Sequence, residues 1–220
     1  MVDIFDEVEE DLRAERAQKL AAKYGWLVFA LAVAIVGAAA GWQLWTRHQA
    51  QQDAATATVY LGVQTALNQQ AAAKGAQLAV LDKLAADAPQ GYRTLARMRA
   101  AGLKADTGDL PGAVAQWNEV AADANVDPLL RDLASLLATD HELDHGDPAQ
   151  LEAQLKPLAE LGKPWAPLAE EQLAMLDLRQ GKVDDARKKL QVLLYDSHAP
   201  SGLRSRASAL LAGMGPQNGK

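Results

Sequence analysis

The hydrophobic and polar positions of this chain follow two different patterns. Residues 24–46 form one run without a charged side chain, closed by Lys23 before it and Arg47 after it. A helix of that length extends about 34 Å, enough to cross a hydrocarbon core of about 30 Å. After the run, apolar residues recur every three or four positions, the period of helices with one buried face. We therefore predict an all-α protein, with a single N-terminal transmembrane helix followed by a helical domain.

Aromatic residues lie near both ends of the uncharged run. Tyr24 and Trp26 lie at its start, and Trp42 and Trp45 lie near its end. Such rings are enriched where a membrane meets water. We interpret these four residues as membrane-interface anchors.

A cleaved signal peptide is the alternative, because the alanines at 38–40 resemble a small-residue cleavage site. The preceding 23 residues are acidic, however, whereas a signal peptide begins with a short basic segment. The uncharged run also continues past the alanines. These features favour a retained anchor.

Basic residues indicate the orientation of the anchor. Four Lys or Arg residues precede the run, whereas Arg47 alone follows it before Lys74. Basic flanks remain in the cytoplasm, and acidic residues contribute little to this rule. We predict a cytoplasmic tail at 1–23, a transmembrane helix at 24–46 and an exported domain at 47–220.

Two further features belong to the tail and the anchor. In the tail, Ile4, Phe5, Val8 and Leu12 form an apolar stripe among acids, which suits either a docking helix or a solvated tail. Small residues share one face of the anchor: Ala30, Ala34, Gly37, Ala38 and Gly41. Such a face lets two membrane helices approach closely, so we predict a helix–helix contact there. Small residues are also common in bacterial anchors without such a contact.

Four glycines divide the domain into units of similar length. Gly75, Gly108, Gly146 and Gly181 are 33, 38 and 35 residues apart, and each separates two helix-forming segments. A helix–turn–helix unit of about 34 residues is typical of tetratricopeptide-type repeats.

Two of the units carry the expected packing pattern. After the glycine, a small residue is followed four positions later by a large apolar one, as in Ala113 with Trp117 and Ala186 with Leu190. The small positions of the preceding helices are Ala101 and Ala174. Close approach of two helices at small residues, with a large side chain filling the gap, predicts helical hairpins.

The other two units depart from this pattern. Three prolines, Pro157, Pro164 and Pro167, interrupt the unit that follows Gly146. We expect an irregular connection at 157–166 with Trp165 packed beneath it. A last helix at 201–213 should cap the stack. The predicted domain is a tetratricopeptide-like α-solenoid of about four hairpins and a C-terminal capping helix.

Composition and motifs argue against several classes of function. The formal charge is −6 and basic residues do not cluster, which argues against a nucleic-acid partner. The absence of cysteine excludes disulfides and thiolate chemistry. Phosphate-binding loops, nucleophile elbows and H-E-x-x-H motifs are also absent. We expect no enzymatic activity, cofactor or small-molecule substrate.

One polar cluster could bind a metal ion. His141 and His145 are four residues apart, and Asp140, Asp144 and Asp147 lie beside them. This spacing would place both imidazoles on one face of a helix. We interpret the cluster as a solvated helix end. A metal-dependent enzyme that uses these residues remains an alternative hypothesis for the function, beside the two given below.

The boundary after the anchor carries a family resemblance. The segment Gly41-Trp42-x-x-Trp45-x-x-His48-Gln49, with a cytoplasmic tail and a degenerate repeat domain, resembles the YfgM-like ancillary subunits of the SecYEG translocon. The resemblance implies a bacterial inner-membrane protein with a cytoplasmic N-terminus and a periplasmic domain. It also implies association with the translocon and with a membrane-anchored periplasmic chaperone of the prolyl-isomerase type. The longer acidic tail departs from the family.

The family pattern also suggests where proteins bind. It directs five residues of the first helices toward a concave surface: Met98, Glu171, Met175, Leu178 and Arg179. The segment 48–73 or the C-terminal helix could instead fill that groove. The first functional hypothesis is a translocon-associated adaptor. The second is an envelope-assembly or division scaffold that uses the anchor only for placement.

Overall fold

The computed structural model describes residues 4–69 and 74–215, with side chains from residue 22 onward except Val28. Within these residues the chain is helical and contains no strand. It divides into two compact units, Met1–Ala55 and Thr56–Lys220. The apolar stripe predicted at residues 4–12 lies among side chains outside the described part.

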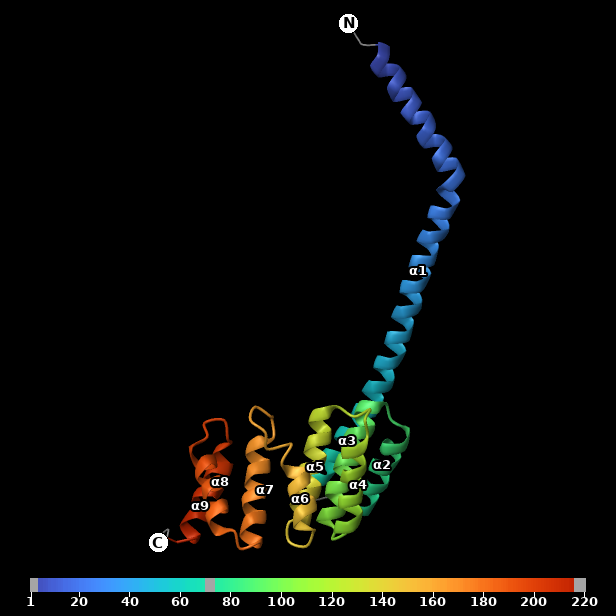
Figure 1. Ribbon diagram of the computed structural model, residues 1–220. Helices are drawn as coiled ribbons and strands as arrows, with labels where there is room; N and C mark the ends of the chain where they lie inside the picture. Colours follow the sequence, from blue (N-terminus) through green and yellow to red (C-terminus); the bar gives the residue numbers. More distant parts are fainter. Residues whose placement is uncertain (1–3, 70–73, 216–220) are drawn as a thin grey trace. The chain divides into compact units, whose positions relative to one another are not determined.

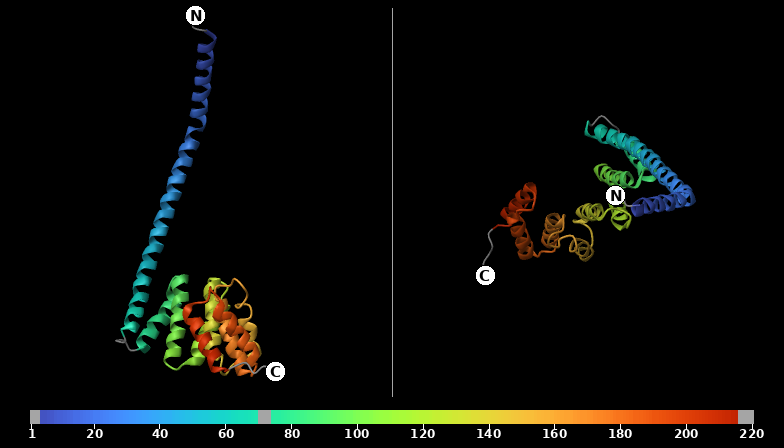
Figure 2. Two further views of the ribbon diagram at one scale, coloured as in Figure 1. Left: turned by 90° about the vertical axis from the view of Figure 1, so that its left-hand side faces the viewer. Right: turned by 90° about the horizontal axis from the view of Figure 1, so that it is seen from above.

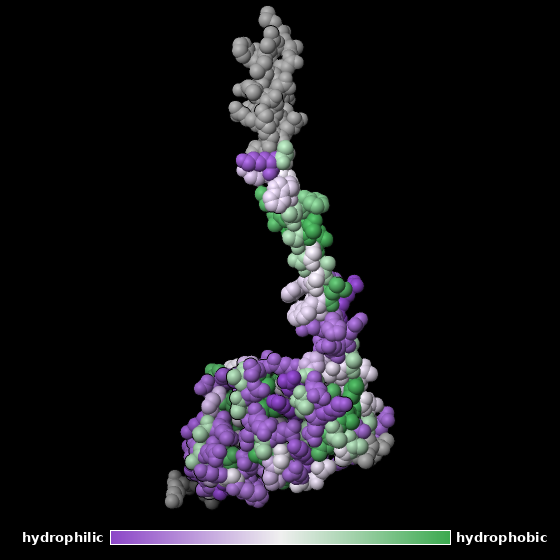
Figure 3. All heavy atoms as spheres, turned by 90° about the vertical axis from the view of Figure 1, so that its right-hand side faces the viewer, coloured by the Kyte–Doolittle hydropathy of each residue, from purple (hydrophilic) through white to green (hydrophobic). Residues whose placement is uncertain are grey.

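The first unit is formed by the N-terminal part of α1 (Ile4–Asn68). The uncharged run at 24–46 is helical throughout, and its apolar side chains are exposed where they are described. Figure 3 shows this stretch as an apolar band with polar residues at both ends. By length and composition, the segment Ala22–Asn68 includes a stretch able to cross a membrane.

The second unit contains the end of α1, from residue 56, and a row of helical hairpins (Figures 1 and 2). Its other described helices are α2 (Lys74–Asp87), α3 (Gln90–Asp106), α4 (Leu110–Ala122), α5 (Pro128–Glu142), α6 (Pro148–Leu155), α7 (Ala166–Arg179), α8 (Val183–Tyr195) and α9 (Ser201–Gly213). From α2 to α9 each helix packs on the next along the chain, and α5–α7 and α7–α9 are also in contact. The predicted all-α, tetratricopeptide-like fold with a final capping helix is confirmed.

Local sequence explains how three of these helices begin. The carboxylates of Asp109, Asp127 and Asp147 each accept a hydrogen bond from an amide of the following turn, at 2.8–3.1 Å. A proline occupies one of the first two positions of each helix, where no intrahelical amide bond is lost. These Asp-Pro combinations start α4, α5 and α6.

Glycine has different roles at the four predicted turn positions. Gly108 and Gly181 have φ values of 91° and 75°, which glycine adopts without the steric cost that a side chain would impose. Gly146 lies in the turn between α5 and α6. The prediction for Gly75 was wrong, because this residue lies in the first turn of α2. Local spacing could not distinguish a glycine between two helices from one in the first turn of a helix.

The two regular hairpins pack as their sequence pattern predicts. In α3–α4, Ala101 and Ala113 are fully buried, and Trp117 fills the space beside them. In α7–α8, Ala174 and Leu190 occupy corresponding buried positions. Small residues therefore bring the paired helices together, and a large side chain closes each gap.

The third hairpin is interrupted, as predicted. The second helix, α6, ends at Leu155, and residues 156–165 form irregular turns before α7 begins. Trp165 packs against a buried cluster that includes Leu155, and its indole Nε1 donates a hydrogen bond to the carbonyl oxygen of Leu129 at 3.0 Å. A tryptophan and an irregular loop thus take the place of a longer second helix.

Candidate protein-binding site

A groove of about 640 Å³ lies on the first helices of successive hairpins, α5 and α7, and on α9. Its walls are mainly leucines, with a methionine and several polar groups. The lining residues are Leu133, Leu136, Leu137, Asp140, Leu143, Leu168, Glu171, Gln172, Met175, Arg206, Ala209 and Leu210. Apolar walls with a few placed polar groups are typical of a binding site.

The polar base of the groove is formed by Gln172, which is 8% exposed. Its Nε2 donates to the carbonyl oxygen of Leu136 at 3.0 Å, and its Oε1 accepts from Thr139 Oγ1 at 2.6 Å. Nε2 also lies 3.4 Å from an oxygen of Asp140. A buried amide must find such partners to offset the loss of hydration. Gln172 therefore connects α7 to α5 and fixes their relative position.

An ion pair crosses the groove between α7 and α9. Arg206 donates two hydrogen bonds to the Glu171 carboxylate, at 2.7 and 2.6 Å. Hydrogen bonding to this carboxylate raises the pKa of the Arg206 guanidinium group. Because Arg206 is exposed, the pair contributes little to stability. Its main consequence is that this part of the groove carries two fixed and mutually neutralising charges.

The structure brings together two of the five residues predicted for the groove. Glu171 and Met175 line it, and Met175 is 38% exposed. Met98 instead packs against the core cluster around Trp117. Leu178 is half-buried outside the groove lining. The Arg179 guanidinium donates to the carbonyl oxygens of Leu143 and Gly146, so it secures the turn between α5 and α6.

Sequence reasoning missed the groove residues Asp140, Gln172 and Arg206. A signal for two of them was present, since Gln172 contacts residues 33 and 36 positions earlier and Arg206 contacts a residue 35 positions earlier. These separations are close to one repeat length of about 34 residues. Polar residues that recur at that spacing can meet on adjacent first helices.

One member of the histidine cluster, His141, packs against another side chain. The His141 ring stacks on Trp117, with ring centroids 5.0 Å apart and planes at 8°. His145 is exposed in the turn after α5. In the part of the chain that the structure describes, no three His, Asp or Glu residues are placed to share a metal ion.

The predicted membrane residues all lie on α1. Trp42 and Trp45 pack with ring centroids 5.5 Å apart, and the Lys23 ammonium group lies 5.4 Å from the Tyr24 ring centroid. Trp26 is exposed. The five small residues, Ala30, Ala34, Gly37, Ala38 and Gly41, are all exposed. A Cβ atom added at either glycine would meet nothing within 4 Å. This face of α1 has room for a neighbouring helix.

Fold and groove define a repeat protein built from stacked helical hairpins. Residues 19–136 match a family described as tetratricopeptide repeat-like domain, and the match covers just over half of the chain. The chain belongs to this family. The matched segment begins before the apolar run of α1 and ends within α5, so α6–α9 lie beyond it.

Other comparisons add no close relative: no curated protein and no solved structure matches the chain. Tetratricopeptide-like repeats typically act as scaffolds that bind proteins rather than as enzymes. The protein is therefore a protein–protein interaction scaffold.

Proposed function

We propose that this protein is a membrane-anchored scaffold and an ancillary subunit of the SecYEG translocon. In this role it links the translocon to a membrane-anchored periplasmic chaperone of the prolyl-isomerase type and to emerging client proteins. The bacterial inner membrane would hold the segment 24–46, with 1–23 in the cytoplasm and 47–220 in the periplasm.

The observation that carries the proposal is the combination of two features in one chain. A tetratricopeptide-like domain follows an exposed apolar helix that has aromatic residues near both ends. The G-W-x-x-W-x-x-H-Q segment lies at the boundary between them and resembles the YfgM-like subunits. A tethered scaffold needs these two parts, one for placement and one for binding.

The two parts would bind different partners. The small-residue face around Gly37 and Gly41 can accept a helix of a membrane partner, because it exposes backbone and leaves open space. The groove on α5, α7 and α9 can accept an apolar protein segment. Met175 in its wall adapts to varied apolar side chains, and the Glu171–Arg206 pair offers polar contacts that orient the segment.

Co-purification from the native membrane tests the proposal. Full-length protein is purified in mild detergent, beside a Gly37→Leu/Gly41→Leu variant. The matched control is Ala32→Leu/Ala39→Leu, which adds similar bulk to the opposite face of the same helix. We expect translocon subunits and a prolyl-isomerase-type chaperone to elute with the wild type and the control. The glycine variant should lose at least one of them.

An anchor exchange separates this proposal from the alternative of an envelope-assembly or division scaffold. Replacing 24–46 by an unrelated transmembrane helix should abolish translocon association if the anchor makes specific contacts. Unchanged association would support an anchor used only for placement. Failure of the wild type to retain either partner would overturn the proposed function.

A further inference from the structure

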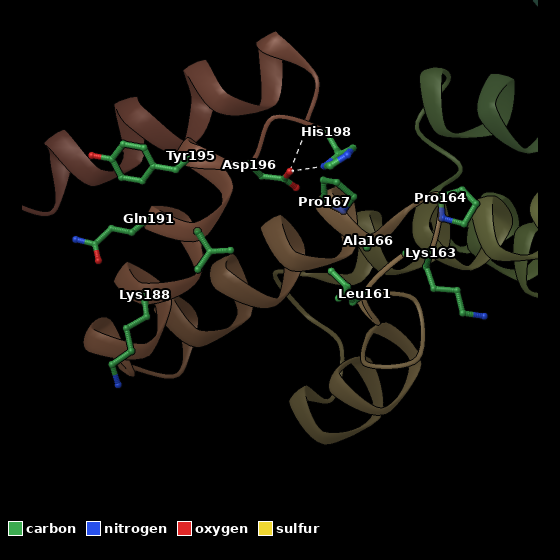
Figure 4. A pocket seen from close by; sticks show the side chains of 12 residues that line it. Leu161, Lys163, Pro164, Ala166, Pro167, Lys188, Gln191, Tyr195, Asp196 and His198 are labelled. Atoms are coloured by element: carbon green, nitrogen blue, oxygen red, sulfur yellow. Dashed lines mark hydrogen bonds and ion pairs between the residues drawn. The ribbon is translucent and has the colours of Figure 1, made fainter.

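A second and larger hollow, of about 1240 Å³, lies between the irregular connection after α6 and the exposed side of α8. Figure 4 shows Leu161, Lys163 and Pro164 from the connection, Lys188 and Tyr195 from α8, and His198 from the turn before α9. It shares no lining residue with the groove on α5, α7 and α9. The hollow is therefore a separate feature of the second unit.

The interruption of the third hairpin explains why this hollow exists. Since α6 ends at Leu155, the chain reaches α7 through turns instead of a longer second helix. Three large side chains around the hollow remain in solvent: Leu161 is fully exposed, Val192 is 68% exposed and Tyr195 is 83% exposed. Single exposed apolar residues are common, but a group gathered around one depression marks an interaction surface.

The charged groups at the hollow are mainly basic. Lys163 lies on the connection and Lys188 on α8. Lys188 is paired with Asp185 at 3.0 Å, but both side chains are largely exposed, so water competes with this contact. The carboxylate of Asp196 accepts a hydrogen bond from the backbone amide of His198 at 2.8 Å and lies 3.3 Å from the His198 ring. The Asp196 carboxylate thus already has a hydrogen-bond partner in His198, whereas the ammonium groups of Lys163 and Lys188 are available to pair with carboxylates of a binding partner.

We propose that this hollow binds a peptide segment of a partner protein, in which apolar side chains are flanked by carboxylates. The apolar side chains would cover Leu161, Val192 and Tyr195, and the carboxylates would pair with Lys163 and Lys188. The volume exceeds the range of about 300–1,000 Å³ typical of small-molecule pockets, which suits a length of polypeptide. The proposal goes beyond the translocon assignment and does not depend on the groove on α5, α7 and α9.

The shape of the site favours a peptide over a membrane surface. Lysines and exposed apolar residues can also bind anionic lipid, but interfacial binding typically uses one continuous apolar face of a helix. Here the apolar residues surround a depression that extends from α8 to the connection and to the turn at His198. A chain segment can enter such a depression and contact several of its walls.

Peptide selection on the intact protein tests the proposal. Full-length protein in phosphatidylcholine nanodiscs is used to select from a displayed library of random 12-residue peptides. Enriched peptides are then measured by fluorescence anisotropy against the wild type and against Val192→Glu, which adds a carboxylate to the hollow. One control is Val183→Glu, an equivalent change at an exposed position on α8 away from the hollow. The other is Met175→Glu, in the groove on α5, α7 and α9.

We expect the enriched peptides to carry Asp or Glu beside apolar residues. Their affinity should fall about tenfold or more in Val192→Glu and stay within about twofold in both controls. Lys163→Glu/Lys188→Glu should shift the selection from acidic to basic peptides. Affinity for acidic peptides should also fall as salt increases, because the flanking contacts are exposed.

Four outcomes would overturn the proposal. The first is that selection on the wild type enriches no peptide beyond those enriched on Val192→Glu. The second is that the enriched peptides bind the wild type and Val192→Glu with equal affinity. If every enriched peptide loses binding in Met175→Glu and none loses binding in Val192→Glu, the peptides belong to the groove on α5, α7 and α9 and the hollow binds none of them. The last outcome is that no peptide is selected and the protein co-floats with phosphatidylglycerol vesicles unless it carries Val192→Glu. This result would show that the hollow binds lipid. Thermal unfolding of each variant, followed by circular dichroism, verifies that the hairpins remain folded.

Discussion

The α3–α4 and α5–α6 hairpins follow one plan but end differently. In both, the second helix begins with an aspartate cap and a proline. α4 continues for 13 residues and buries Trp117 and Val120, whereas α6 stops after eight residues. The complete helix closes the hairpin with apolar packing. Because α6 is short, the contact between its hairpin and the next one is made by Trp165, Gln172 and an irregular connection.

The two hairpins therefore depend on different forces. The α3–α4 hairpin is held by a continuous apolar cluster that extends into α5. The junction between α5 and α7 combines a smaller apolar cluster with buried hydrogen bonds between residues one repeat apart. In the hairpin with the short α6 helix, polar contacts thus replace part of the hydrophobic packing. The shortening of this helix also leaves the hollow beside α8 open.

The largest expected effect concerns the complete hairpin. Trp117→Ala removes a ring that is 2% exposed and leaves a cavity among small residues that cannot fill it. The free energy of unfolding should fall by about 3–5 kcal/mol. Thermal and urea unfolding of the full-length protein in mild detergent would measure it. Leu161→Ala, at a fully exposed position of the connection, should change stability by less than about 0.5 kcal/mol.

The polar junction should be weaker but still measurable. Gln172→Leu removes the hydrogen bonds to Thr139 and to the carbonyl of Leu136, and it should cost about 1–3 kcal/mol. A double-mutant cycle with Thr139→Val would isolate the coupling between α7 and α5. Additive losses in the cycle would show that this hydrogen bond does not join the two hairpins.

Two glycine substitutions should have opposite signs. Gly108→Ala places a side chain at a φ of 91°, which should cost about 1–2 kcal/mol. Gly75→Ala lies within α2, with nothing within 4 Å of the new Cβ, and should stabilise the protein by about 0.4–1 kcal/mol. Unfolding midpoints of the two variants provide the comparison. A loss at both positions would contradict the placement of Gly75 in a helix.

The smallest effect concerns Glu170, near the ion pair between Lys189 and Asp177. Burial raises the pKa of the Glu170 carboxyl group above its ordinary value of 4.5, with Asp177 adding to the shift and Lys189 opposing it. The folded state therefore holds this proton more tightly than the unfolded chain does. The resulting stability is present below pH 4.5 and is lost as pH rises through the folded-state pKa.

Glu170→Gln removes this ionisation and should raise the melting temperature at pH 7 by about 2 °C, with almost no change at pH 4. Melting curves at both pH values would detect the difference. Glu119→Gln, at an exposed position on α4, is the matched control. An equal shift at both pH values would show that ionisation of Glu170 is not the cause.

The sequence by itself determined the helices, the turns at Gly108 and Gly181, the interruption before Trp165 and the small-to-large pattern of two hairpins. These features depend on signals within one or two helical turns, such as an Asp-Pro cap or a proline that ends a helix. Only the tertiary structure decided which polar residues meet. Glu171 with Arg206 and Gln172 with Thr139 pair across adjacent first helices, and Arg179 secures a turn instead of lining the groove. Such contacts join residues 33–36 positions apart, so they depend on how one hairpin stacks on the next.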